Sequence, residues 1–185
     1  MTVVVGLVRD GKIYMGSDRM ATWGNKTVIM SDPKIKEEGE FLLGSAGSLG
    51  TLQILFDAFE MPAIKEEQTQ STYLLNDFAP AFRKRLKELG MLEEKNGKQS
   101  TDNHFVIGFR GKLFSVGGNL SMVEHADSYC SIGSGSEFAL GVLHALTGDK
   151  NLKPEKIIER ALEAAAHHNP YVAEPFDIIS GAEKK

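Results

Sequence analysis

The chain has 185 residues, of which 42% are hydrophobic and 25% are charged, and its formal net charge at pH 7 is −4. This length predicts a single domain over residues 1–185, and the composition is ordinary for a globular protein with a sizeable core. The small acidic charge and the lack of a basic stripe exclude an electrostatic nucleic-acid binder, since such binding needs clustered lysine and arginine.

The cysteine content and the first residues of the chain indicate the cellular compartment of the protein. A single cysteine, Cys130, excludes an internal disulfide and fits a reducing compartment. The first residues show no basic segment followed by an apolar one, as a secretory signal would, and no apolar run reaches the ~18 residues that span a bilayer. We therefore expect a soluble cytoplasmic protein with no membrane partner.

The first part of the chain predicts strands. Its opening segment is almost continuously β-branched, as in a strand buried on both faces, and Asp10-Gly11 is a tight-hairpin pair. The strands expected here cover residues 2–8, 12–18, 27–30 and 41–45.

Two helices are expected next, over about residues 48–59 and 71–89, because apolar residues recur there at helical spacing. Pro80 lies inside the second and predicts either a kink or a late helix start. The segment 93–101 is polar and is expected to form a loop.

The remainder of the chain repeats the order of strands followed by helices and adds a last strand. The expected strands cover residues 104–109, 113–116, 128–132 and 176–179, and the expected helices cover about 134–147 and 154–167. Runs of strands followed by runs of helices predict segregated layers. The expected fold class is therefore α+β, with two stacked sheets between two helix pairs in a four-layer αββα sandwich.

Thr2 stands directly behind Met1. Methionine aminopeptidase removes methionine before a small side chain, which would leave a threonine whose hydroxyl and free α-amine belong to one residue. An α-amine has a pKa of about 7.7–8.0, close to what a general base needs near neutral pH, and it can activate a threonine hydroxyl. Many proteins begin with Met-Thr, so this feature alone favours an ordinary strand start.

Further sequence blocks change that interpretation. They occur in residues 2–6, 16–22, 34–35, 44–48, 132–136 and 138–143. In their order and approximate spacing, the chain resembles the proteasome β-subunit and HslV family of N-terminal-nucleophile (Ntn) hydrolases. The resemblance extends from residue 2 to about residue 165 and implies the family's proteasome-like αββα fold.

The resemblance also implies a catalytic set. Thr2 matches the nucleophile, and Lys34 matches the lysine whose ammonium would lower the pKa of the neighbouring amine by charge repulsion. Asp18 matches the carboxylate that holds this lysine. Gly47 corresponds to the oxyanion-hole N–H, and Ser134 to the serine beside the threonine amine.

Each of these residues also has an ordinary explanation. Lys34 could be a surface side chain after a turn, Asp18 a strand-end residue and Gly47 a turn glycine. Ser134 and Glu137 have the spacing of a capping box, so Ser134 could simply cap the helix that follows.

The C-terminal quarter departs from the family pattern. Where the family often has an aspartate followed three residues later by a serine, this chain has Asn169 and Val172. Asparagine keeps a hydrogen bond but carries no charge, and valine keeps neither.

No cofactor or metal site is expected. His167 and His168 are adjacent, so on a helix they point about 100° apart and cannot form an i,i+4 metal pair. Cys130 lies in an apolar strand, as a core residue would. The segment 133–135 precedes a helix but lacks both glycine-rich phosphate-binding patterns.

Taken together, these features predict a self-compartmentalising threonine-type endopeptidase subunit that cleaves unfolded proteins or peptides. The resemblance further implies a homo-oligomeric ring with sites facing an enclosed chamber, and it leaves an unfoldase ATPase partner open. Two alternatives remain at this point. One is a catalytically inactive ring-forming structural or regulatory subunit, and the other is a small-molecule amidase with an open, monomeric pocket.

Overall fold

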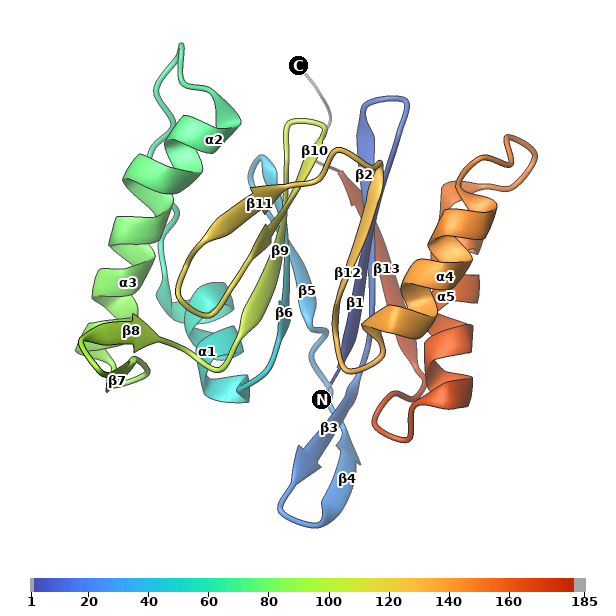
Figure 1. Cartoon of the computed structure of the whole chain (residues 1–185), viewed down its shortest axis with the longest axis horizontal. Coiled ribbons are helices and arrows are strands. Elements are labelled where there is room, and N and C mark those ends of the chain that lie inside the picture. The colour runs from blue at the N-terminus through green and yellow to red at the C-terminus, as the bar shows by residue number, and fades with distance from the viewer. Residues whose placement is uncertain (1, 182–185) are drawn as a thin grey trace.

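The computed structural model describes residues 2–181 and has four layers, helix on sheet on sheet on helix (Figure 1). This arrangement confirms the αββα sandwich that the order of elements predicts. The first sheet has strand order β12-β1-β2-β13, and all its pairings are antiparallel. Its strands are β1 (Val3–Arg9), β2 (Lys12–Asp18), β12 (Tyr129–Gly133) and β13 (Phe176–Gly181).

The second sheet has strand order β11-β10-β9-β6-β5 and is also antiparallel. Its strands are β5 (Ile35–Glu38), β6 (Phe41–Ala46), β9 (His104–Phe109), β10 (Lys112–Val116) and β11 (Met122–Glu124). β1 and β6 are inner strands of their sheets and are buried along nearly their whole length. That double burial accounts for their continuous apolar sequences.

Helices cover the outer face of each sheet (Figure 1). The first sheet carries α4 (Ser136–Leu146) and α5 (Pro154–His168), and the second carries α1 (Leu49–Gln53), α2 (Gln70–Tyr73) and α3 (Ala79–Glu88). Three apolar clusters fill the spaces between the four layers. Within residues 2–181, no helix is long and apolar enough to cross a membrane.

Several short strands were not expected from the sequence. The strand expected at 27–30 is present as β4 (Lys26–Ile29), and it pairs with the unexpected β3 (Met20–Trp23) in a hairpin that projects beyond the sandwich (Figure 1). The expected polar loop at 93–101 contains another hairpin, β7 (Glu93–Lys95) with β8 (Lys98–Ser100). The unexpected strands β5, β7, β8 and β11 are short and largely exposed, and β3 has only four residues, so they lack the apolar runs or alternation that reveal a strand.

The first helical region, expected over 48–59, begins at Leu49 and continues from α1 into a π-helical segment at Ile54–Ala58. The second has a π-helical segment at Leu74–Phe78, after which α3 begins. The helical region begins at Gln70 with α2 and continues without interruption into α3, so it does not start late at Pro80, which occupies the first turn of α3. Proline has no N–H to donate and crowds the carbonyl four residues earlier, which accounts for the change of helix type just before it.

Candidate active site

Thr2 lies immediately before β1 and is buried. The next residue, Val3, pairs with Gly133 of β12, and Val4 pairs with Ser17 of β2. Because β1 is hydrogen-bonded on both sides, the position of Thr2 is fixed by the sheet and not by a flexible terminus.

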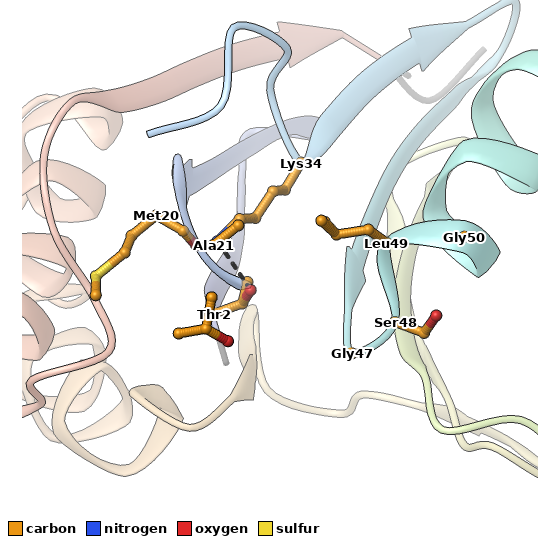
Figure 2. Close-up of a pocket in the computed structure, with 9 residues that line it drawn as sticks. Thr2, Met20, Ala21, Lys34, Gly47, Ser48, Leu49 and Gly50 are labelled. Carbon is orange, nitrogen blue, oxygen red and sulfur yellow. Dashed lines mark hydrogen bonds between the residues drawn. The ribbon is translucent and has the colours of Figure 1, made fainter. Parts of the chain in front are cut away.

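Lys34 reaches Thr2 from the loop that precedes β5 (Figure 2). Its side chain is only 1% exposed. The ammonium Nζ donates to Thr2 Oγ1 at 2.9 Å and lies 3.0 Å from both carboxylate oxygens of Asp18. It also donates to the carbonyl oxygen of Met20. The lysine therefore bridges the threonine hydroxyl and a buried carboxylate.

Asp18 is the last residue of β2, and its carboxylate is surrounded by donors. Besides Lys34, the backbone N–H groups of Val3 and Met20 each donate to it at 3.0 Å. Hydrogen bonds from four N–H directions favour the ionised carboxylate. Two of the four, from Val3 and Met20, link it to β1 and to the residue two positions further along the chain, so Asp18 also orients the backbone beside Thr2.

Burial and pairing act in opposite directions on this ion pair. Burial raises the pKa of the Asp18 carboxyl and lowers the pKa of the Lys34 ammonium, while the charge of each partner opposes both changes. A lysine with a lowered pKa parts with a proton more readily than an exposed one. The pair is thus suited to stabilise negative charge that develops on Thr2 Oγ1.

Ser134 is placed at the backbone of Thr2, and the capping prediction is wrong. The N-cap of α4 is Gly135, which makes no side-chain cap hydrogen bond. Instead, Thr2 N donates to Ser134 Oγ at 3.3 Å, and that hydroxyl donates to Thr2 O at 3.4 Å. A tertiary contact with the first strand therefore replaces the local capping contact.

The loop that carries Ser134 depends on close backbone approach. Gly133 has φ +93°, and a Cβ built on it would lie 2.2 Å from the carbonyl oxygen of Thr2. On the far side, Asn169 Nδ2 donates to Ser134 O at 2.6 Å. Asn169 therefore supports the site indirectly, while Val172 is buried in the apolar cluster between α5 and the first sheet.

Gly47 forms the opposite wall, in the turn between β6 and α1. Its φ is +137°, and an added Cβ would meet the carbonyl oxygen of Asp102 at 2.3 Å. Asn103, which the sequence did not single out, holds this turn. Its Oδ1 accepts from Ser48 N at 2.9 Å, and its Nδ2 donates to Ser48 O at 3.0 Å.

A cavity of about 290 Å³ opens between these walls (Figure 2). Its lining comprises Thr2, Met20, Ala21, Thr22, Lys34, Gly47, Ser48, Leu49 and Gly50. A smaller cavity of about 150 Å³ lies against Thr2, Ala46, Gly47, His104, Gly133 and Ser134. All five residues singled out from the sequence, Thr2, Asp18, Lys34, Gly47 and Ser134, thus come together around one hydroxyl.

The other candidates lie elsewhere. His167 and His168 pack edge to face at the end of α5, and the ring of His168 stacks on Phe138. Burial raises the pKa of the Cys130 thiol to about 12, so this residue is a protonated core side chain. Within residues 2–181 there is no group of three or more His, Cys, Asp or Glu side chains that could hold a metal ion.

Comparison with known proteins identifies the family of this chain. The model of the family described as "Proteasome subunit" matches residues 2–178. The ATP-dependent protease subunit HslV of Sulfurovum sp. (strain NBC37-1) is 30% identical over 167 residues, covering 89% of each chain. The HslV subunit of Chlorobium luteolum (strain DSM 273 / BCRC 81028 / 2530) is 31% identical over 170 residues, covering 89% of this chain and 86% of its own.

Solved structures support the fold. The structure of Thiobacillus denitrificans BPH in complex with epoxomicin has a TM-score of 0.83 and 22% sequence identity, and the match covers 100% of both chains. At this identity the likeness concerns the arrangement of helices and sheets.

Proposed function

Because this chain belongs to the proteasome subunit family, we propose that it is a threonine-type peptidase subunit of a proteolytic complex. In this proposal Thr2, exposed as the first residue by the loss of Met1, attacks peptide bonds. The observation that carries the proposal is the contact of 2.9 Å between Lys34 Nζ and Thr2 Oγ1, with Asp18 paired to the same ammonium. A purely structural subunit has no need of a buried lysine aimed at a buried threonine.

The proposed reaction has two stages. The α-amine of Thr2 takes the proton of its own hydroxyl as Oγ1 bonds to the substrate carbonyl carbon, and the proton then passes to the leaving amine as the C–N bond breaks. Water next attacks the carbonyl carbon of the resulting ester and gives a proton to the amine; the bond between that carbon and Oγ1 then breaks, the amine returns the proton to Oγ1, and the acid product leaves. Negative charge on the carbonyl oxygen would be stabilised by the Gly47 N–H, which shares the cavity with Thr2.

Removal of Met1 is required by this chemistry. While methionine is attached, the nitrogen of Thr2 is an amide and cannot act as a base. Met1 lies outside the described residues, so its loss belongs to the proposal. Ser134 Oγ, 3.3 Å from the Thr2 nitrogen, would then receive a hydrogen bond from the free amine.

Asn169 and Val172 bear on the alternative of an inactive subunit. Asn169 lacks a charge, yet its amide holds the Ser134 carbonyl, and Ser134 in turn contacts Thr2. Val172 contributes packing at the base of the same loop. Since this corner keeps its contact with Thr2 through neutral groups, the departures from the family pattern do not remove the geometry that favours an enzyme.

The relatives support a proposal about the assembly and the substrate. The curated relatives are named subunits of an ATP-dependent protease, and we infer that this chain likewise assembles into a homo-oligomeric ring and acts on unfolded proteins or peptides. An unfoldase ATPase that feeds such a ring is part of the same proposal.

The proposal is tested on the purified assembly. Mass spectrometry should show a chain lacking Met1, and epoxomicin should add one inhibitor mass to a peptide that begins at Thr2. Hydrolysis of a fluorogenic peptide should disappear in Thr2→Ala and persist in Thr72→Ala, a control at an exposed position of α2. Retention of Met1 in the mature chain, or hydrolysis that survives in Thr2→Ala, would refute the proposed mechanism.

A further inference from the structure

Arg19 connects three segments of the chain beside the candidate active site. Its Nε donates to Asp177 Oδ2 at 2.7 Å, and its Nη2 donates to Asp177 Oδ1 at 2.6 Å. The remaining nitrogen, Nη1, donates to the carbonyl oxygen of Ser31. The Arg19 carbonyl itself accepts from Met30 N at 2.9 Å. One side chain thus joins the end of β2, the C-terminal strand β13 and the loop that leads to Lys34.

Arg19 is connected to two groups that set the position of Lys34. It is the sequence neighbour of the acceptors of the Lys34 ammonium, and it donates a hydrogen bond to the loop that leads to Lys34. Arg19 stands between Asp18 and Met20, which together supply three of the oxygen acceptors around the Lys34 ammonium. Ser31, which Arg19 also binds, comes three residues before Lys34 in the chain. Movement of either the acceptors or the loop would change the distance between Lys34 Nζ and Thr2 Oγ1.

We propose that Arg19, held by its ion pair with Asp177, is a positioning residue. It keeps Lys34 and the acceptors of the Lys34 ammonium in the positions from which Lys34 contacts Thr2. This inference rests on the proposed function of Thr2. Arg19 does not touch the nucleophile, and although it lies within the block 16–22 that resembles the family, the resemblance assigned it no catalytic role. Its effect passes through Lys34.

The chemistry of the guanidinium suits this role. A planar fork can bind both oxygens of one carboxylate and still donate sideways to a carbonyl, which a lysine ammonium cannot do with the same geometry. The side chains of Arg19 and Asp177 are 27% and 19% exposed. Ion pairs that are partly open to water contribute little to overall stability. The expected consequence of losing this pair is therefore a local displacement and not unfolding.

The test compares Arg19→Gln and Asp177→Asn with a control that removes a similar ion pair elsewhere. Arg110 pairs with Glu40, with exposures of 25% and 29%, at the end of β6 opposite to Gly47. We expect kcat for peptide hydrolysis to fall roughly tenfold to a hundredfold in the two test variants, because small misplacements of catalytic groups have effects of this size. KM should stay within about twofold of the wild type, and Arg110→Gln should leave both constants unchanged.

The pH profile distinguishes positioning from general damage. A displaced Lys34 ammonium repels the protonated Thr2 amine less, so the amine keeps its proton to higher pH and the acid limb of kcat/KM should move upward in pH. The double variant Arg19→Gln/Asp177→Asn should be no worse than either single variant, since both single substitutions remove the same ion pair. An unshifted acid limb, or additive losses in the double variant, would overturn the inference.

A second readout does not depend on activity. Hydrogen–deuterium exchange should accelerate at the amides of Met20, bonded to Asp18, and Met30, bonded to Arg19, in Arg19→Gln but not in Arg110→Gln. Unchanged exchange at both amides would refute this positioning role even in a preparation without measurable hydrolysis. Hydrolysis that survives in Thr2→Ala would instead refute the proposed function, so the two failures are distinguishable.

Discussion

Replacement of Lys34 by methionine removes the ammonium while keeping a side chain of similar length. In the folded chain this leaves the Asp18 carboxylate, which is 0% exposed, with only the Val3 and Met20 N–H groups as donors. Breaking a buried ion pair on one side costs about 3–5 kcal/mol of unfolding free energy. For a chain of this size each kcal/mol lowers the melting temperature by roughly 2–4 °C, so we expect a decrease of roughly 6–20 °C.

The pH dependence of this deficit follows from Asp18. Burial raises the pKa of this carboxyl above its ordinary value of 3.8, and without Lys34 the opposing charge is gone. The folded variant therefore holds a proton at pH values where the unfolded chain has lost it. A carboxyl whose pKa is raised by folding lowers the unfolding free energy least at pH values below its pKa in the unfolded chain. It lowers the unfolding free energy most at pH values above its pKa in the folded chain. The difference in melting temperature between Lys34→Met and the wild type should thus grow with rising pH and shrink toward about pH 4.

Thermal unfolding measures this difference in melting temperature. The proteins are compared at equal concentration, since assembly makes the melting temperature depend on protein concentration. The matched control is Lys112→Met, which removes an exposed lysine that lies 2.7 Å from Glu124. Exposed pairs contribute about 0–1 kcal/mol, so this control should melt close to the wild type. If Lys34→Met melts no lower than Lys112→Met, or if its deficit stays constant from pH 8 to about pH 4, the reasoning about a buried pair is wrong.

Three further predictions concern other parts of the site. Gly133→Ala should lower the melting temperature and abolish hydrolysis, because its Cβ would lie 2.2 Å from Thr2 O, whereas alanine at the open Gly141 should change neither. Asn103→Ala should cost about 2–4 kcal/mol of unfolding free energy by leaving buried groups of the Gly47 turn unpaired; chemical denaturation that gives less than about 0.5 kcal/mol would contradict this. Cys130, with a pKa of about 12, should resist iodoacetamide in the native protein at pH 8 and react once the chain is unfolded, so rapid native alkylation would show that the thiol is not buried.

The layered fold could be predicted because the longest elements carry strong periodic signals. β1 and β6 are buried on both faces, and α5 begins at Pro154 as its sequence indicates. The short strands β3 and β5 could not be identified in this way. Their position depends on the hairpin and sheet partner they meet in space, and most of their neighbours in sequence are polar or exposed.

The candidate site was predictable only in part, because most of its contacts are distant in sequence. Ser134 was interpreted as either a cap or a site residue, and the local pattern alone could not decide between a contact three residues away and one 132 residues away. The contacts of Asn103 and Arg19 could not be inferred from the neighbouring sequence, since their partners lie 55 and 158 residues away. A polar residue directly before a strongly apolar strand is the one feature that could have drawn attention to Asn103.

The junction between Thr2 and the 133–135 loop has a consequence for the timing of biosynthesis. The first strand leaves the ribosome early, but its neighbour β12 and the Ser134 hydroxyl are made more than a hundred residues later. A nascent or truncated polypeptide therefore cannot complete the surroundings of the threonine. The surroundings of Thr2 are therefore complete only after the 133–135 loop has been synthesised and β12 has paired with β1.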